Sequence, residues 1–134
     1  MGSGRFERGM ETRREVLGEA HVAAAEANKT DFDADFQSLI TEMAWGSVWA
    51  RPGLDRRTRS LVTIAMLAAQ GRNEELGMHL RASRNTGVKQ SELTEVLLHV
   101  AIYAGVPAAN AAFKLAKSTL ADAESQESRD GPAK

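Results

Sequence analysis

Apolar residues recur every three or four positions along most of this chain, the spacing expected of amphipathic helices. No stretch alternates apolar and polar residues as a half-buried strand would. The pattern predicts helices over 5–17, 31–45, 55–70, 73–86, 90–104 and from 107 onward, with a helical or irregular link over 21–28. We therefore expect an all-α fold of five or six main helices with short connections.

Glycines and N-cap residues predict where these helices end and begin. Glycines are expected to follow three of them, because glycine readily adopts the left-handed conformation just after a helix. They are Gly18, Gly87 and Gly105. Other helices are expected to begin at an N-cap residue, whose side chain accepts a hydrogen bond from a backbone N–H of the first turn. The expected N-caps are Thr30 or Asp31, Asp55 and Asn73. Gly46 and the turn at 51–53 predict a break between the second and third long helices.

The apolar residues also predict the core. Between Leu61 and Ala69 only Thr63 is not apolar, so this helix should be buried on nearly all sides, although it is too short to span a bilayer. The stripe expected on 90–104 comprises Leu93, Val96, Leu97, Val100, Ala101 and Ala104. The last helix has a small-residue face of Ala108, Ala111, Ala112, Leu115 and Ala116. So many apolar residues in a small chain indicate a subunit interface.

Length and composition narrow the class of protein. With 134 residues the chain is expected to form one domain over 1–134, with flexible polar tails at 1–4 and about 122–134. Its 17 Lys and Arg against 18 Asp and Glu leave a net charge of −1, which gives no reason to expect nucleic-acid binding. No signal peptide or apolar run of 18 residues is present, so we expect no membrane association and a cytoplasmic location. The absence of cysteine excludes disulfides, thiolate metal sites and a cysteine nucleophile.

The histidines are the first candidates for chemistry. Glu75 and His79 are four residues apart on a predicted helix, so the carboxylate could orient the imidazole and raise its pKa for proton transfer near neutral pH. The alternative is an ion pair on an exposed surface. His99 lies beside the core stripe and is expected to be structural, while the role of His21 stays open. The three histidines match no usual zinc-ligand spacing, so no metal site is expected.

Arginines form the second candidate group. Arg51, Arg56, Arg57 and Arg59 have only Asp55 as an acidic neighbour, and Arg72, Arg81 and Arg84 follow. Three of them occupy the first turns of a predicted helix, where the helix dipole disfavours cations, so an anion should offset them. That anion could be the acidic 31–42 helix, a partner subunit or a carboxylate ligand, which arginine binds in a bidentate manner. A solvated face is the simpler alternative.

The aromatic residues do not by themselves distinguish a core role from a role in a ligand pocket. Trp45 and Trp49 are four residues apart and could be core anchors or the walls of a ligand pocket, and Tyr103 is open in the same way. No glycine-rich dinucleotide motif, phosphate-binding loop or nucleophile elbow occurs, so no cofactor is expected.

Five segments together resemble the carboxymuconolactone decarboxylase family of the AhpD-like superfamily. They are RREVLGEAHV (13–22), AWGSVWARPGL (44–54), RSLVTIAML (59–67), NEELGMHLR (73–81) and AIYAGVPAAN (101–110), and the likeness extends over about 5–121. The resemblance implies an AhpD-like helical bundle that assembles as a homo-oligomer, a trimer or hexamer. It also implies decarboxylation, without a cofactor, of 4-carboxymuconolactone, a small dicarboxylate lactone, to β-ketoadipate enol-lactone and CO₂ in protocatechuate catabolism.

The resemblance also suggests site residues. His79 would donate the proton, oriented by Glu75, while Arg51, Arg72 and Arg59 would bind carboxylate or oxyanion. Trp45 and Tyr103 would wall the pocket, and His21 could join it from another subunit. Thiol peroxidases of the superfamily carry a CxxCxxxH motif, whose cysteines fall here on Arg72 and Glu75, and their acidic relay residue falls on Ser60. Peroxidase activity is therefore not expected. Ala104 stands where the family usually has cysteine, a position with no obvious catalytic role.

Two other functions remain open from the sequence. A related enzyme could act on a different lactone with the same scaffold. A non-catalytic helical oligomer or binding module would instead place Glu75 and His79 on an exposed surface rather than in a pocket.

Overall fold

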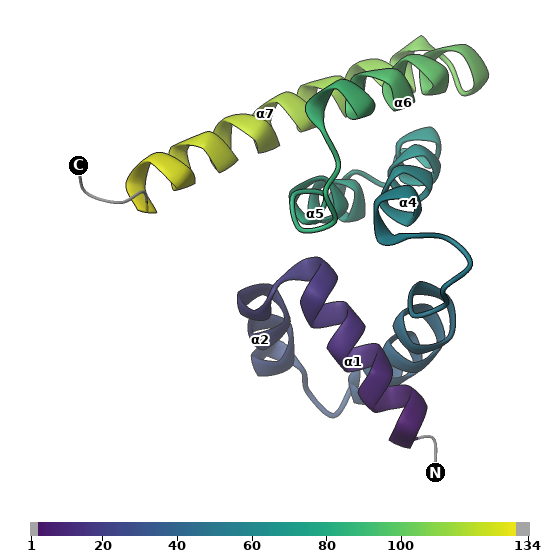
Figure 1. Cartoon of the computed structure of the whole chain (residues 1–134), viewed down its shortest axis with the longest axis vertical. Coiled ribbons are helices and arrows are strands. Elements are labelled where there is room, and N and C mark those ends of the chain that lie inside the picture. Colours follow the sequence, from purple (N-terminus) through teal and green to yellow (C-terminus); the bar gives the residue numbers. More distant parts are fainter. Residues whose placement is uncertain (1–2, 131–134) are drawn as a thin grey trace. The chain divides into compact units, whose positions relative to one another are not determined.

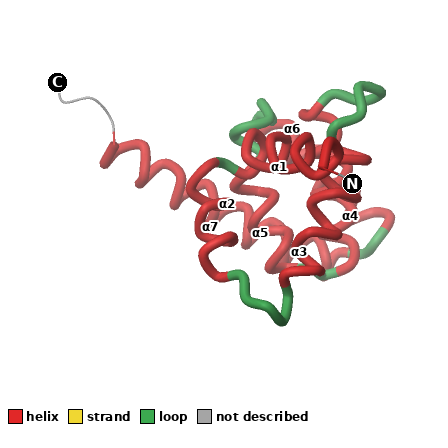
Figure 2. Tube along the Cα trace, turned by 90° about the horizontal axis from the view of Figure 1, so that it is seen from below, coloured by secondary structure: helices red, strands yellow, loops and turns green. Residues whose placement is uncertain are grey.

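Every regular element of the computed structural model is helical over residues 3–130, the part of the chain that it describes (Figure 2). The elements in this range are seven α-helices and one π-helical segment, η1 (Figure 1). They are α1 (Ser3–Leu17), α2 (Glu19–Asn28), α3 (Ala34–Ile40), η1 (Thr41–Trp49), α4 (Arg56–Gln70), α5 (Asn73–Ala82), α6 (Gln90–Tyr103) and α7 (Val106–Asp130). The all-α prediction is confirmed, with more helical segments than the five or six expected.

The chain divides into two compact units. Unit 1 is Met1–Arg59 and unit 2 is Ser60–Lys134, so the division falls inside α4. The expectation of one domain over the whole chain stays a prediction.

Unit 1 is built on an unusually close approach of α1 and η1, which pack against each other along their length. A Cβ atom added to Gly9 would collide with the carbonyl oxygen of Thr41 and lie 2.9 Å from the amide nitrogen of Gly46. A Cβ added to Gly46 would collide with the carbonyl oxygen of Arg5. The two glycines therefore let the helices meet backbone to backbone.

This contact explains why the predicted break at Gly46 is wrong. Gly46 lies inside η1, and the chain remains helical from Ala34 to Trp49 rather than over 31–45. The expected N-caps at Thr30 and Asp31 are also wrong, because Asp33 takes that position without a side-chain cap. Thr30 instead accepts a hydrogen bond from the backbone of Phe32 in the preceding turn.

A buried cation stabilises the same helix pair. Arg13 of α1 is buried and donates hydrogen bonds of 3.3 Å to Thr41 Oγ1 and to Gln37 Oε1. Burial lowers the pKa of Arg13, and the charge of Glu26 acts in the opposite direction. The apolar residues buried in unit 1 are Met10, Val16, Leu17, Val22, Trp45 and Trp49.

Unit 2 has a conventional aliphatic core, to which α4, α5, α6 and α7 all contribute. Its buried members are Ile64, Ala68, Leu76, Leu80, Leu93, Leu97, Val100, Ala109, Ala112 and Ala116. The predicted stripes of α6 and α7 are therefore confirmed in their main positions, although Ala104 and Ala111 are exposed. The expectation that α4 is buried on nearly all sides is wrong, since Met66 is 56% exposed and Val62 is 40% exposed.

Three of the remaining predicted helix ends are confirmed and two are wrong. Gly18 and Gly105 have positive φ angles after α1 and α6, as predicted, and Asp55 Oδ1 accepts a 2.7 Å hydrogen bond from the backbone N–H of Thr58. That hydrogen bond lowers the pKa of Asp55. The other two predictions are wrong: α5 ends at Ala82, so Gly87 belongs to a later turn, and Asn73 is the first helical residue rather than the N-cap.

The ends of the chain are more helical than expected. Residues 3–4 belong to α1 and residues 122–130 to α7, so these parts of the predicted tails are helical. Residues 1–2 and 131–134 lie outside the described range. No helix in the described part of the chain is both long and apolar enough to cross a membrane.

Candidate active site

Three of the predicted site residues belong to α5 or directly precede it. Arg72 directly precedes the helix, and its carbonyl oxygen accepts a 2.9 Å hydrogen bond from the amide of Leu76. Glu75 follows one turn later and is exposed, whereas His79 is only 6% exposed. His79 therefore does not lie on an exposed face, as the surface ion-pair interpretation required.

The surroundings of His79 are apolar and shielded. It lies in the last turn of α5 and is buried. The buried side chains of Leu76 and Leu80 belong to the same helix face. The imidazole is therefore largely shielded from water.

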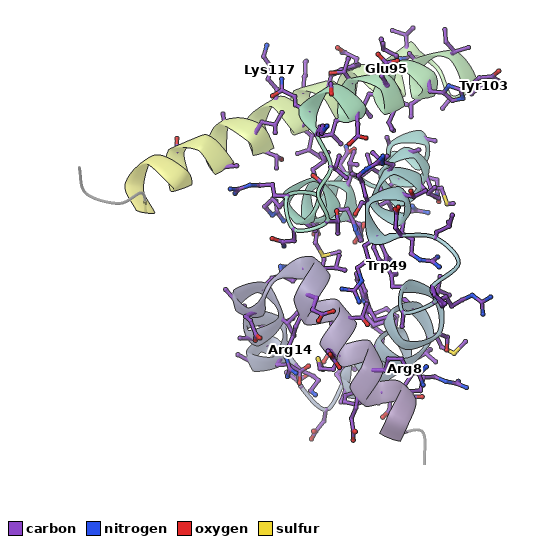
Figure 3. The ribbon with its side chains drawn as sticks, in the orientation of Figure 1. Arg8, Arg14, Trp49, Glu95, Tyr103 and Lys117 are labelled. Carbon is purple, nitrogen blue, oxygen red and sulfur yellow. The ribbon has the colours of Figure 1, made fainter. Side chains whose placement is uncertain are left out.

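Tyr103 lies elsewhere in unit 2, at the end of α6 (Figure 3). Its ring stacks on His99, with 4.8 Å between the ring centroids and 29° between the planes. Both rings line a groove of about 480 Å³ between α4 and α6, which also includes Met66 and Glu95. The residues that line this groove do not include Arg72, Glu75 or His79.

His99 corrects the sequence interpretation. It was expected to be a structural histidine beside the core, but its side chain is exposed and forms part of a groove wall. Glu95 lies one turn before it, so α6 carries the same Glu-x-x-x-His spacing as α5. The sequence signal was present, but only the structure shows which histidine is buried.

The tryptophans of unit 1 are core residues. Trp45 and Trp49 are both buried, and their rings stack with centroids 5.0 Å apart and planes at 29°. This arrangement matches the core-anchor alternative. It leaves the predicted role of Trp45 in a pocket wall as a prediction.

The arginines near residue 55 contact different partners. Arg59 Nη2 donates a 3.1 Å hydrogen bond to the carbonyl oxygen of Arg51, and the buried Nε of Arg59 has no partner among the described residues. Arg56 forms a 2.6 Å ion pair with Glu15. The anion that offsets Arg56 is therefore Glu15 of α1 and not the acidic 31–42 segment.

Arg51 lines a polar pocket of about 460 Å³ in unit 1. Arg5 and Arg8 of α1 line the same pocket, together with Ser47 of η1. The sequence interpretation missed these two arginines, because nothing in their spacing connects them with Arg51. His21 is exposed on α2 and does not line this pocket.

No group of three or more histidine, aspartate and glutamate side chains within the described residues could hold a metal ion.

Comparison with known proteins adds independent information. A family model described as the carboxymuconolactone decarboxylase family matches residues 34–118. The chain belongs to the carboxymuconolactone decarboxylase family. The matched range contains Arg51, Arg72, His79 and Tyr103, whereas Arg5, Arg8 and His21 precede it.

Individual relatives give a finer comparison. The chain is 55% identical over 118 residues to the 4-carboxymuconolactone decarboxylase of Acinetobacter baylyi, an alignment that covers 88% of each protein. It is 44% identical over 117 residues to the nitrosuccinic acid decarboxylase npaB of Metarhizium robertsii, covering 87% of this chain and 82% of the relative. A 42-residue alignment with 4-carboxymuconolactone decarboxylase of Pseudomonas putida has 45% identity and covers 31% of this chain and 88% of that relative.

Proposed function

We propose that this protein decarboxylates 4-carboxymuconolactone to β-ketoadipate enol-lactone and CO₂, a step of protocatechuate catabolism. The observation that carries this conclusion is the 55% identity to the Acinetobacter baylyi 4-carboxymuconolactone decarboxylase over 88% of both chains. The enzyme is thus a carboxy-lyase.

The substrate itself provides the route for the electrons. The departing carboxylate is attached to the carbon that bears the lactone oxygen, next to a C=C bond conjugated with the lactone carbonyl. When the C–COO⁻ bond breaks, its electron pair moves through the C=C bond to the carbonyl oxygen and forms a dienolate. Protonation of the α carbon then gives the enol-lactone, so the reaction needs no cofactor as an electron sink.

The protein has three tasks in this reaction: to bind two carboxylates, stabilise an oxyanion and deliver a proton. We assign the proton to His79, a role supported by its burial in the last turn of α5, where water has little access to the imidazole. Glu75, one turn earlier, would orient the imidazole. General acid catalysis of this kind is worth about 10²–10⁴-fold in rate.

Carboxylate and oxyanion binding is assigned to arginines. Arg72 and Arg51 are exposed and can reach a ligand, and the buried Nε of Arg59 has no hydrogen-bond partner among the described residues. Trp45 and Tyr103 are proposed as pocket walls and His21 as a residue that joins the site from another subunit. Tyr103 is exposed, so its ring is accessible to a ligand.

A second substrate is favoured by one specific observation. The npaB relative, at 44% identity over 87% of this chain, is a nitrosuccinic acid decarboxylase. In nitrosuccinate the nitro group can accept the electron pair left by CO₂, so the two substrates share two carboxylates and a built-in electron sink. The same scaffold could therefore serve either reaction, or the decarboxylation of another lactone.

A comparison of kcat/KM between substrates tests this proposal. Purified protein is assayed with 4-carboxymuconolactone, nitrosuccinate and related lactones, and product is identified by mass spectrometry. We expect kcat/KM for 4-carboxymuconolactone to exceed the others by at least about tenfold, a preference of about 1.4 kcal/mol. Faster turnover of another substrate would replace the assignment, and no turnover of any would favour a binding module.

We also propose that the chain assembles as a homo-oligomer, a trimer or hexamer, in the cytoplasm. Large apolar side chains remain exposed, among them Phe32 at 98% and Ile102 at 78%, and burial in a subunit interface would remove them from water. Light scattering coupled to gel filtration gives the mass of the assembly, and a monomer at micromolar concentration would contradict the proposal.

A further inference from the structure

The polar pocket of unit 1 combines side chains from two helices and the turn that follows them. Arg5 and Arg8 lie one turn apart on α1, and Arg51 lies two residues after the end of η1. Figure 3 shows Arg8 on α1. Ser47 contributes the remaining polar side chain of the pocket lining.

All the charged side chains that line this pocket are positive. Three guanidinium groups line it, and no carboxylate does. None of the three forms an ion pair or side-chain hydrogen bond with any side chain that the structure describes. Like charges at this spacing on one helix are destabilising, and the start of a helix also disfavours cations. An anion bound between them would relieve both effects.

Gly46 brings the two helices close enough to form the pocket. A Cβ at this position would collide with the Arg5 backbone and lie 2.9 Å from Arg5 Cγ, so the stem of the Arg5 side chain packs directly on the glycine. Arg5 is therefore held against η1, the helix that leads to Arg51, rather than projecting freely from the end of α1. All three arginines are exposed, and the contact with Gly46 fixes the stem of Arg5 on the side of α1 that faces η1.

We propose that Arg5, Arg8 and Arg51 form a binding site for a small dicarboxylate. A guanidinium group binds one carboxylate through two parallel hydrogen bonds. Three such groups therefore match a ligand with two carboxylates better than a ligand with one carboxylate. The volume of about 460 Å³ lies in the range of small-molecule sites. The view that this dicarboxylate is the substrate rests on the proposed function, whereas dicarboxylate binding itself does not. Arg5 and Arg8 would then be substrate-binding residues in addition to Arg51.

The test measures binding and turnover separately on the full chain. Isothermal titration calorimetry with adipate, an unreactive dicarboxylate, is performed on the wild type and on the double variant Arg5→Gln/Arg8→Gln. We expect the double variant to bind adipate at least about tenfold more weakly, because charge-assisted hydrogen bonds are lost. In the decarboxylase assay its KM should rise by a similar factor while kcat changes less than about twofold.

A matched control separates this effect from general loss of charge. Arg14 lies on the same helix, outside the pocket, and is ion-paired at 4.0 Å with Glu19. Arg14→Gln should bind adipate as the wild type does, and circular dichroism should show the same helix content in all variants. Equal weakening in Arg14→Gln would overturn the proposal.

Each remaining outcome also decides the question. Hexanoate, a monocarboxylate, should bind at least about tenfold more weakly than adipate, and equally tight binding of hexanoate or inorganic phosphate would overturn the dicarboxylate assignment. Normal decarboxylation without adipate binding would overturn the pocket and leave the proposed function intact. Adipate binding that depends on Arg5 and Arg8, in a protein that does not decarboxylate the lactone, would support the pocket and overturn the proposed function.

Discussion

Helices α5 and α6 carry the same pair of residue types at the same spacing, yet the structure gives them opposite surroundings. Glu75 and His79 on α5 match Glu95 and His99 on α6. His79 is buried, whereas His99 is exposed and stacks on Tyr103. Spacing along a helix therefore identifies which side chains can meet, but not how deeply they are buried.

The difference follows from the register of each histidine with the core. His79 comes three residues after the buried Leu76, so both side chains lie on one stripe of α5. His99 comes two residues after the buried Leu97, which turns it to the opposite side of α6. The buried histidine is shielded from water, whereas the exposed one forms part of a groove wall.

The largest expected effect is on catalysis by the two histidines. His79→Ala should lower kcat by about 10²–10⁴-fold, because the proton donor is removed. His99→Ala is the matched control and should change kcat less than about twofold. Steady-state kinetics on the two purified variants measures both, with thermal unfolding as a check of folding. A loss below tenfold for His79→Ala, or an equal loss for His99→Ala, would remove the distinction between the helices.

The register of α6 can be tested through its neighbouring leucines. Leu97 is fully buried, so Leu97→Ala should reduce the free energy of unfolding by about 2–5 kcal/mol. Leu98, which is 50% exposed, should tolerate alanine within about 0.5 kcal/mol. Urea denaturation followed by circular dichroism gives both values. Similar losses at the two positions would contradict the burial pattern that turns His99 outward.

Arg72 tests whether the start of α5 binds the substrate. Arg72→Ala should reduce kcat/KM by about 10–100-fold, since a hydrogen bond to a charged group is worth about 1.5–3 kcal/mol. Arg81→Ala, at the other end of the same helix, serves as the control and should reduce it less than about threefold. If the two variants behave alike in the kinetic assay, the effect comes from general charge and not from a specific contact.

The smallest effect is expected for Glu75. Glu75 is exposed and its charge is screened by water, so Glu75→Gln should move the alkaline limb of the kcat–pH profile by only about 0.2–0.4 pH units. The shift should be toward lower pH, because removing the carboxylate favours the neutral imidazole, which has no proton to donate. Glu74→Gln is the neighbouring control. A profile that Glu75→Gln leaves unmoved would refute an orienting role that acts through charge.

Periodicity predicted the helical class and most of the core of unit 2 correctly. Leu93, Leu97 and Val100 are buried as the apolar stripe of α6 required. It failed in unit 1, where Gly46 was expected to break a helix. In isolation glycine weakens a helix, but here it allows the close contact of η1 with α1, which the local sequence does not reveal.

The candidate site shows the same division. Residue type and spacing made Glu75 and His79 candidates, and the family resemblance narrowed the arginines to Arg51, Arg72 and Arg59. Arg5 and Arg8 were missed, since they are more than 40 residues from Arg51 in the chain and meet it only through packing. Tyr103 was expected beside His79, yet it lines a groove that His79 does not enter.

The sequence by itself determined the helical class, the aliphatic stripes and the inventory of groups able to do the chemistry, because these depend on residue type and local spacing. Only the tertiary structure decided which histidine is buried, where Gly46 permits close packing and which arginines share a pocket. Those properties depend on contacts between residues distant in the chain, and the energy of such contacts is not encoded in any single helix.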